Sequence, residues 1–284
     1  MSGTLEPAAG SRMNGRADDN ATDDALARHR EELKKRFPLP SPVKKTQQKP
    51  ATLGVLLSAI ALGLVWLDPA YQSTSYSSSP GQVQHIALSD GSVLTLDGAS
   101  QVEVSWHLRS RRVDLQAGQA LFDVAPARYR PFRTLAGSAE ITVVGTRYNV
   151  SRLEDDVRVT VEEGKVEVRG QESKLRLTPG QQVRVHNGQF DKPTQVDAQS
   201  LTGWVEGRLV FDRTPLAEVL DTLKRQQNTI VRLNDPALAQ LPVSGIFERA
   251  NLSALPALLP KILPLELHTA ADGSLSLSRQ GEKK

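Results

Sequence analysis

The most apolar stretch of the chain is residues 51–67, ATLGVLLSAIALGLVWL, which contains no charged residue. A helix of this length covers roughly 26 Å, close to the ~30 Å thickness of a bilayer's hydrocarbon core. Trp66, at its end, and Tyr71, just beyond it, suit the interface between membrane and water. The pattern therefore predicts one transmembrane helix over residues 51–67. A helix buried in a protein core is the alternative.

Residues 85–198 alternate apolar and polar positions in short runs. In HIALSDGSVLTLDG, every second residue is apolar on either side of Asp90-Gly91, which is typical of a β-hairpin. The segments 113–124, 157–168 and 175–185 each have the pattern of a strand, a turn with glycine and a second strand. We therefore predict an all-β domain, built as a solenoid-like stack of short strands or, alternatively, as a sandwich.

Residues 204–280 mix the two periodicities. RLVFD, TIVRL and PVSGIFE have the pattern of strands, and Pro215 opens a helical segment. Apolar residues recur there at helical spacing: Leu216, Val219, Leu220 and Leu223. A short apolar helix, LSALPALLPKIL, follows, and LELHTA and SLSLSR form a last hairpin. The order β-α-β-β-α-β-β predicts a small α+β domain.

Two polar segments flank the apolar stretch. Residues 1–50 are expected to be largely disordered, with a short helix near residues 23–37 that the proline-rich PLPSP segment ends. Residues 68–84 include QSTSYSSSPGQ, and this composition predicts a serine-rich linker.

Positive charge is concentrated before the apolar stretch, although the net charge is only +3. The residues directly before it include Lys34, Lys35, Arg36, Lys44, Lys45 and Lys49, with no acidic residue among them. After Asp68, no lysine or arginine occurs until Arg109. The positive-inside rule then orients the N-terminus toward the cytoplasm and everything after residue 67 outside it. A cleavable signal peptide is the alternative, but a basic lead of about fifty residues is too long for one. Because membrane orientation explains the basic run, we expect no direct contact with nucleic acid.

The residues that usually carry chemistry are sparse. The chain has no cysteine, and its five histidines lie far apart without metal-ligand spacing. Neither a glycine-rich phosphate loop nor a nucleophile elbow is present. We therefore expect no metal, no cofactor and no enzymatic activity on a diffusible substrate.

Gly145-Thr146, within EITVVGTRYNV (140–150), has two interpretations. The glycine can simply mark a bulge or a close approach of two backbone segments. Alternatively, the threonine hydroxyl attacks the preceding carbonyl, which requires a strained peptide and a nearby base.

Residues 102–150 resemble the core of the FecR domain, and the resemblance covers roughly residues 82–190. A strand-pair motif and a V-x-G-T-x-aromatic-x-V block carry it, with Pro131-Phe132 between them. The motif positions are Leu115, Gly118, Ala120, Phe122, Val124, Val143, Tyr148 and Val150. The region 204–280 is similar to the small secretin/TonB short N-terminal fold that follows the β domain in FecR-type proteins.

The resemblance implies an inner-membrane sensor of bacterial cell-surface signalling. Its periplasmic part would be contacted by the signalling domain of an outer-membrane TonB-dependent receptor loaded with an iron carrier. Its cytoplasmic part would control an extracytoplasmic-function (ECF) sigma factor that transcribes uptake genes. In some FecR-type proteins the Gly-Thr of the motif is a site of self-cleavage by an N-to-O acyl shift, which here would fall at Gly145-Thr146.

The segment before the membrane departs from the family pattern, which usually has a longer helical anti-sigma domain bearing tryptophan. The resemblance therefore leaves three roles for this tail: a minimal sigma-binding helix, a dock for a separate anti-sigma protein, or neither. A periplasmic scaffold anchored in the inner membrane, with no role in transcription, is the alternative function. A membrane-anchored enzyme or autoprocessing hydrolase is a third.

Overall fold

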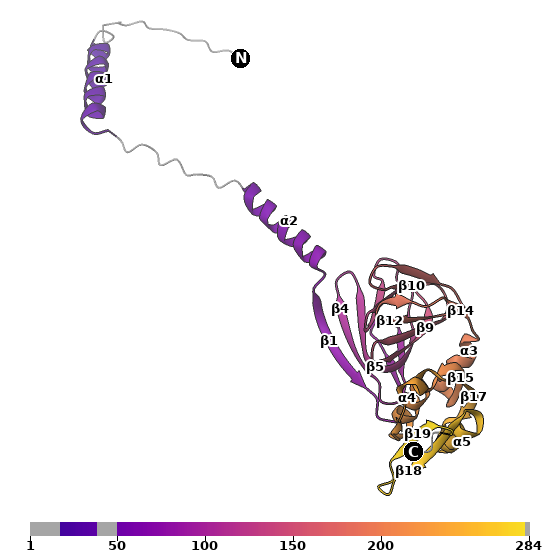
Figure 1. Ribbon diagram of the computed structural model, residues 1–284. Helices are drawn as coiled ribbons and strands as arrows, with labels where there is room; N and C mark the ends of the chain where they lie inside the picture. Colours follow the sequence, from indigo (N-terminus) through magenta and orange to yellow (C-terminus); the bar gives the residue numbers. More distant parts are fainter. Residues whose placement is uncertain (1–17, 39–49, 282–284) are drawn as a thin grey trace, which may run out of the picture. The chain divides into compact units, whose positions relative to one another are not determined.

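The structure is a computed structural model that describes residues 18–38 and 50–281 (Figure 1). The chain divides into two compact units, Met1–Ser58 and Ala59–Lys284. In the first unit, helix α1 spans Asp18–Arg36 and so begins five residues before the predicted helix near residues 23–37. Its described side chains are all exposed, including Leu26 and Leu33, and so is Phe37 just after it.

Helix α2 spans Pro50–Leu67, so the predicted helix over residues 51–67 is confirmed as a helix. Its described apolar side chains lie mostly exposed, among them Val55, Leu62 and Trp66. Within the ranges that the structure describes, a helix both long and apolar enough to cross a membrane is not found. The membrane crossing therefore stays a prediction.

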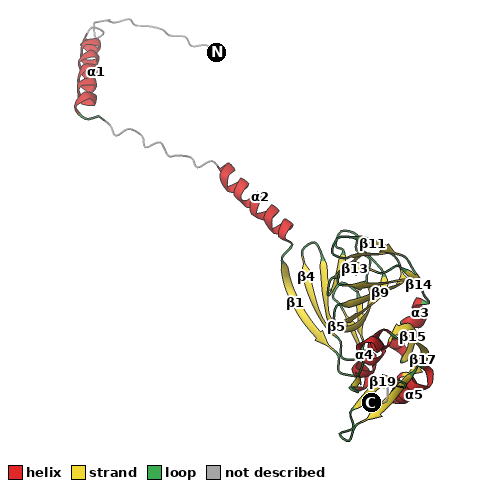
Figure 2. Ribbon diagram, in the orientation of Figure 1, coloured by secondary structure: helices red, strands yellow, loops and turns green. Residues whose placement is uncertain are grey.

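The β domain consists of two sheets that share one core (Figure 2). Sheet A runs in the order β1 (Ala70–Ser77), β4 (Gln101–His107), the first half of β5 (Arg111–Asp123), β6 (Phe132–Ala136), β7 (Ala139–Val143), β10 (Val166–Arg169) and β11 (Lys174–Leu177). Sheet B runs in the order β2 (Gln84–Ala87), β3 (Val93–Leu96), the second half of β5, β8 (Arg147–Leu153), β9 (Asp156–Glu163) and β12 (Gln181–His186). The short strands β13 (Gln189–Phe190) and β14 (Thr194–Gln195) both pair with β12. The prediction of an all-β domain is confirmed, and its strands form two layers.

Strand β5 belongs to both sheets. Its first half pairs with β4 and β6, and its second half pairs with β3 and β8. The change occurs at Gly118, which has φ +86° and where an added Cβ would lie 2.7 Å from the Cα of Ser100. The hairpin predicted for residues 113–124 is therefore wrong, because the glycine bends one continuous strand instead of reversing it.

The other two predicted strand–turn–strand segments also cross between the sheets. Around Gly164, β9 lies in sheet B and β10 in sheet A, and around Gly180, β11 lies in sheet A and β12 in sheet B. Both glycines have positive φ, which bends the chain sharply without pairing the flanking strands. The hairpin around Asp90-Gly91 is confirmed, since β2 pairs with β3 there, and so is the last hairpin of the chain, since β18 (Leu265–Thr269) pairs with β19 (Leu275–Arg279).

Residues 68–84 are not the predicted linker. Strand β1 (Ala70–Ser77) lies within the segment and pairs antiparallel with β4 along its length, so the β domain begins at Ala70. The serine and threonine side chains are tolerated because β1 is the edge strand of sheet A, with few residues turned to the core. Of the residues in β1, Tyr76 packs against that core.

The α+β domain has the predicted element order. Its strands and helices are β15 (Arg208–Pro215), α4 (Leu216–Gln227), β16 (Val231–Leu233), β17 (Pro242–Glu248), α5 (Leu255–Ile262), β18 (Leu265–Thr269) and β19 (Leu275–Arg279). Short helical turns precede or link them: α3 (Ala198–Leu201) and the 3-10 turns Gly203–Glu206, Pro236–Gln240 and Arg249–Ala254. Strand β15 pairs with β17, and β19 lies between β16 and β18. The predicted apolar face of α4 is confirmed, because Leu216, Val219 and Leu223 are fully buried.

Candidate functional site at the junction of the two domains

The end of helix α4 is held by a buried carboxylate of the β domain. Asp97, just after β3, accepts hydrogen bonds from Arg225 Nη1 and Gln226 Nε2, each at 2.5 Å, and its side chain is only 1% exposed. Arg225 Nε also donates to Asp221 Oδ2 at 2.8 Å. Burial opposes the charge on Arg225, but Asp97 and Asp221 outweigh it and raise the pKa of the guanidinium. The arginine therefore remains charged inside the junction.

Two glycines of the β domain let the backbone of α4 come close. The amide N–H of Gly81 donates to the carbonyl oxygen of Arg225 at 3.0 Å, which satisfies one of the free carbonyls in the helix's last turn. A Cβ added at Gly81 would lie 2.6 Å from the carbonyl oxygen of Gln226, and one at Gly98 would lie 2.7 Å from that of Arg225. Any larger residue at either position would push the helix away.

The first turn of α4 is tied to sheet B by ion pairs. Glu218 accepts from Arg158 Nη2 of β9 at 2.5 Å and from Arg184 Nη2 of β12 at 2.8 Å. Burial lowers the pKa of Arg158 more than the Glu218 carboxylate raises it. A carboxylate in a helix's first turn also interacts favourably with the helix dipole. Both ends of α4 are thus fixed to the β domain by charged groups.

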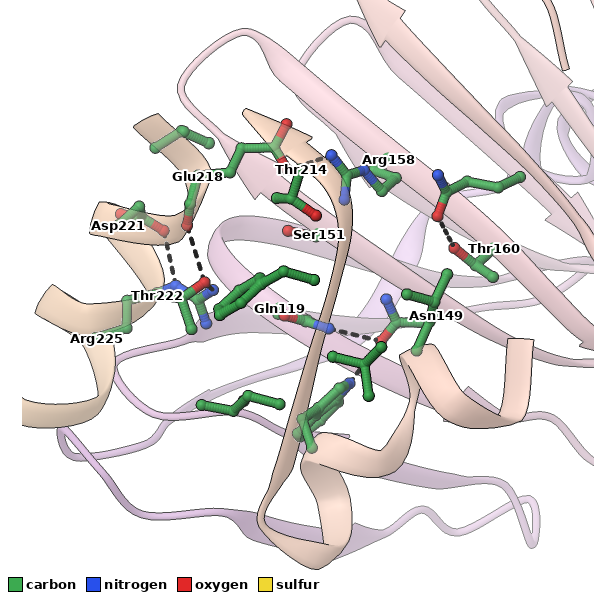
Figure 3. Close-up of a pocket in the computed structure, with 17 residues that line it drawn as sticks. Gln119, Asn149, Ser151, Arg158, Thr160, Thr214, Glu218, Asp221, Thr222 and Arg225 are labelled. Atoms are coloured by element: carbon green, nitrogen blue, oxygen red, sulfur yellow. Dashed lines mark hydrogen bonds and ion pairs between the residues drawn. The ribbon is translucent and has the colours of Figure 1, made fainter. Parts of the chain in front are cut away.

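Between these contacts lies a polar cavity of about 70 Å³ (Figure 3). At its base, Asn149 Oδ1 accepts from Gln119 Nε2 and from Trp204 Nε1, both at 3.2 Å. Leu121 of β5 packs into the core of the α+β domain beside Trp204. The lining contains neither histidine nor cysteine, and a polar space of this size suits a few hydrogen-bonded waters. The arrangement joins the two domains through hydrogen bonds, ion pairs and apolar packing.

The eight motif positions predicted from the sequence lie inside the β domain. All except Gly118 are buried hydrophobic side chains of its core: Leu115, Ala120, Phe122, Val124, Val143, Tyr148 and Val150. Phe122 stacks on Tyr148 with ring centroids 5.0 Å apart, and the Tyr148 hydroxyl is 2.7 Å from Thr134 Oγ1. Burial raises the pKa of Tyr148 well above its usual range. The motif therefore specifies packing between the two sheets and forms no binding surface.

Gly145-Thr146 connects β7 to β8. The close-approach interpretation is confirmed, because a Cβ added at Gly145 would lie 3.0 Å from Pro126 Cα. Thr146 is 5% exposed, and its hydroxyl donates to the carbonyl oxygen of Lys165 at 3.2 Å. Neither residue has φ in the left-handed region. Self-cleavage here stays a prediction, which the intact mass of the purified protein would test.

Lys44, Lys45 and Lys49, predicted to orient the membrane segment, lie outside the described residues. Sequence reasoning missed the junction residues Asp97 and Arg225. They are 128 positions apart, and no local pattern marks an ion pair at that separation.

Known proteins resemble these domains. Residues 74–167 match the family model for "FecR protein". A crystal structure described as a "putative anti-sigma factor" from Parabacteroides distasonis ATCC 8503, at 2.50 Å resolution, is 27% identical with a TM-score of 0.66, over 73% of this chain and 99% of that one. A second structure of the same description, at 1.65 Å, gives 27% identity and a TM-score of 0.66 over 72% and 99%. No curated protein matches the chain.

Proposed function

Residues 74–167 form a FecR domain, and from that premise we propose that this chain regulates a sigma factor as a transmembrane signal transducer. The observation that carries the proposal is the likeness to the Parabacteroides structures, which extends over 99% of their length and therefore beyond the FecR domain alone. In this proposal, the occupancy of an outer-membrane TonB-dependent receptor is relayed across the inner membrane to an ECF sigma factor, which then transcribes iron-carrier uptake genes.

The proposed anchor is α2, inserted once in the bacterial inner membrane. Its 18 residues carry no charge, and its described leucine, valine and isoleucine side chains point outward with little to cover them. An apolar helix surface of that kind is stable when lipid surrounds it. The lysines before α2 favour a cytoplasmic N-terminus, and the two folded domains would then lie in the periplasm.

The proposed receptor-binding surface is the outer edge of β17 in the α+β domain. Within the described chain, β17 pairs only with β15, so its other edge is open to a partner strand. Ile246 on this strand is 68% exposed. A strand of the receptor's signalling domain could pair there and bury Ile246.

The proposed cytoplasmic contact is α1. Leu26 and Leu33 on the helix and Phe37 just after it are 66%, 49% and 72% exposed, which is unusual for three large apolar side chains so close together. They would pack against the sigma factor itself or against a separate anti-sigma protein.

The test is a cross-linked pull-down of the full chain from membranes of iron-starved cells, with mass spectrometry of the retained proteins. We expect a TonB-dependent receptor together with a sigma factor or a small helical anti-sigma protein. The variant L26A/L33A/F37A should lose the cytoplasmic partner and keep the receptor. I246D should lose the receptor and keep the cytoplasmic partner.

The matched control for α1 is R28A, which changes an exposed side chain that lies 3.9 Å from Asp24. It should retain both partners. Recovery of envelope proteins alone from the unchanged chain, with no effect of iron, would contradict signalling and would identify a periplasmic scaffold instead.

A further inference from the structure

The end of α2 is bound directly to the β domain. Asp68 accepts from the Arg109 backbone N–H at 2.7 Å and from Ser110 Oγ at 2.6 Å, and its own carbonyl oxygen is 2.5 Å from His107 Nδ1. Arg109 Nη1 reaches the carbonyl oxygen of Val65 at 3.3 Å. The loop 108–110 between β4 and β5 therefore lies beside the last turn of α2.

A second loop, between β5 and β6, is held at the same end of the domain by Arg130. Its Nη2 donates to the Tyr71 hydroxyl at 2.8 Å and to the carbonyl oxygen of His107. Its guanidinium also lies 5.5 Å from the ring centroid of Trp106. Two loops and the start of β1 thus surround the point where α2 ends.

The side chains that this end presents to solvent are aromatic, apolar or basic. Trp66 is 82% exposed, Tyr71 60%, Leu108 56% and Tyr129 99%. Arg109 and Arg128 are exposed beside them. The acidic groups here are already engaged, since Asp68 accepts from Arg109 and Ser110, and Asp90 is paired with Arg111. The surface therefore has net positive character.

This composition matches the interface of a lipid bilayer. Tyrosine and tryptophan rings prefer the headgroup level, where the apolar ring and the polar atom are both satisfied. Each arginine near an anionic leaflet is attracted to it electrostatically. A protein partner is not required to cover these side chains, because the helix that ends among them would itself lead into lipid.

We propose that Trp66, Tyr71 and the loops 108–110 and 126–131 form a membrane-contacting surface that binds the anionic phospholipid headgroups around the anchor. The proposal rests on the proposed insertion of α2. It means that the β domain rests on the bilayer surface rather than standing away from it. The height of the α+β domain above the membrane is then fixed by the β domain.

The test uses single-cysteine labelling, because the chain contains no cysteine. The full chain carrying L108C or Y129C is labelled with a fluorophore and reconstituted in phosphatidylcholine vesicles with or without phosphatidylglycerol. Nitroxide lipids that quench near the headgroup are added. We expect both labels to lose more than about half of their fluorescence when phosphatidylglycerol is present, and less without it.

The matched control is S173C, at an exposed turn. Strand pairing places Arg111, Phe132, Val143 and Val166 at the end of sheet A nearest α2, so the turn after β10 lies at the opposite end. This label should not be quenched.

A label at L57C, in α2, read with nitroxides deep in the acyl chains, reports insertion separately. Suppose that the label at position 57 is quenched, while the labels at positions 108 and 129 are quenched no more than the label at position 173. Insertion of α2 is then supported, and the proposed membrane-contacting surface is wrong. If Leu57 is not quenched, the anchor itself fails and the surface fails with it.

Discussion

Gly164 shows how closely two backbone segments meet beside Gly145-Thr146. A Cβ added at Gly164 would lie 2.9 Å from both the Gly145 carbonyl oxygen and Thr146 Oγ1. Because real Cβ atoms do not approach so closely, one of the segments would have to move. The predicted Gly145-Thr146 motif thus packs closely against Gly164, which is not part of the motif.

We predict that Gly164→Ala destabilises the β domain by about 2–4 kcal/mol, which combines left-handed backbone strain with overpacking. Gly273→Ala is the matched control, because Gly273 has nearly the same φ, +82° against +84°, and open space around it. Urea unfolding of the two variants measures the difference. If Gly164→Ala and Gly273→Ala lose the same stability, the close contact at Gly164 does not contribute to the loss.

Asp90 provides a pH-dependent contribution to stability. Burial raises its pKa, but hydrogen bonds from Arg111 and Ser92 outweigh burial, so the pKa lies below its usual value. A lowered folded pKa means that the carboxylate stabilises the fold above the unfolded pKa, about 3.9, and that this stability is lost as pH falls through the folded pKa. Asp90→Asn should therefore flatten the decline in unfolding free energy below about pH 4.

The measurement for Asp90 is urea unfolding between pH 2.5 and 7, compared with the unchanged chain at about ten pH values. Asp155→Asn, a change at an exposed carboxylate in the β8–β9 turn, is the control and should leave the slope as it is. A slope for Asp90→Asn that matches the unchanged chain would rule out this role.

At the scale of elements, helix α4 is the part that joins the two domains, and Asp97 is its main contact. Asp97→Ala leaves the Arg225 guanidinium buried with Asp221 alone, and we predict a loss of about 3 kcal/mol. Adding Arg225→Leu should recover part of it, because the buried cation is then gone and the remaining Asp221 carboxylate is 21% exposed to solvent. Lys174→Ala, at an exposed pair, should cost less than about 1 kcal/mol.

Hydrogen exchange locates the effect of Asp97→Ala. We expect faster exchange along α4 with little change in sheet A, because the junction opens while the core of the β domain persists. If exchange accelerates equally in both domains, the junction does not act as a separate unit.

Strand positions were predictable from the sequence, but strand partners were not. Alternation identifies which side chains of β9 and β10 face a core, and both were expected as strands. A glycine with positive φ occurs equally in a hairpin and in a crossing between sheets, so Gly164 could not distinguish them. Strand β1 was missed because its serines and threonines lack the apolar alternation that marks a half-buried strand. Tyr76, which packs against the core, was the available signal.

At the scale of the whole molecule, the Ala59–Lys284 unit has a continuous path from the end of α2 to the α+β domain. Asp68 binds the loop after β4, β1 pairs with β4, and Gly81 binds the end of α4. A displacement of α4 can therefore reach α2 through paired backbone. The predicted flexible linker would have absorbed such a displacement.

We predict that Asp68→Gly loosens this path. Glycine suits the positive φ of 44° at this position, so the change removes the two accepted hydrogen bonds without adding backbone strain. Spin labels at L62C and S173C in nanodiscs should show a broader distance distribution. Gln72→Ala, on the exposed face of β1, is the control, and the idea fails if both variants leave the distribution narrow.

The direct passage from α2 into β1 also restricts insertions and deletions. One residue added within α2 would rotate everything before it by about 100° relative to the β domain and shift it by about 1.5 Å. A change of seven residues would nearly restore the original rotational phase. Functional chains should therefore tolerate length changes in α2 according to helical phase, whereas a chain with a true linker would tolerate any small change.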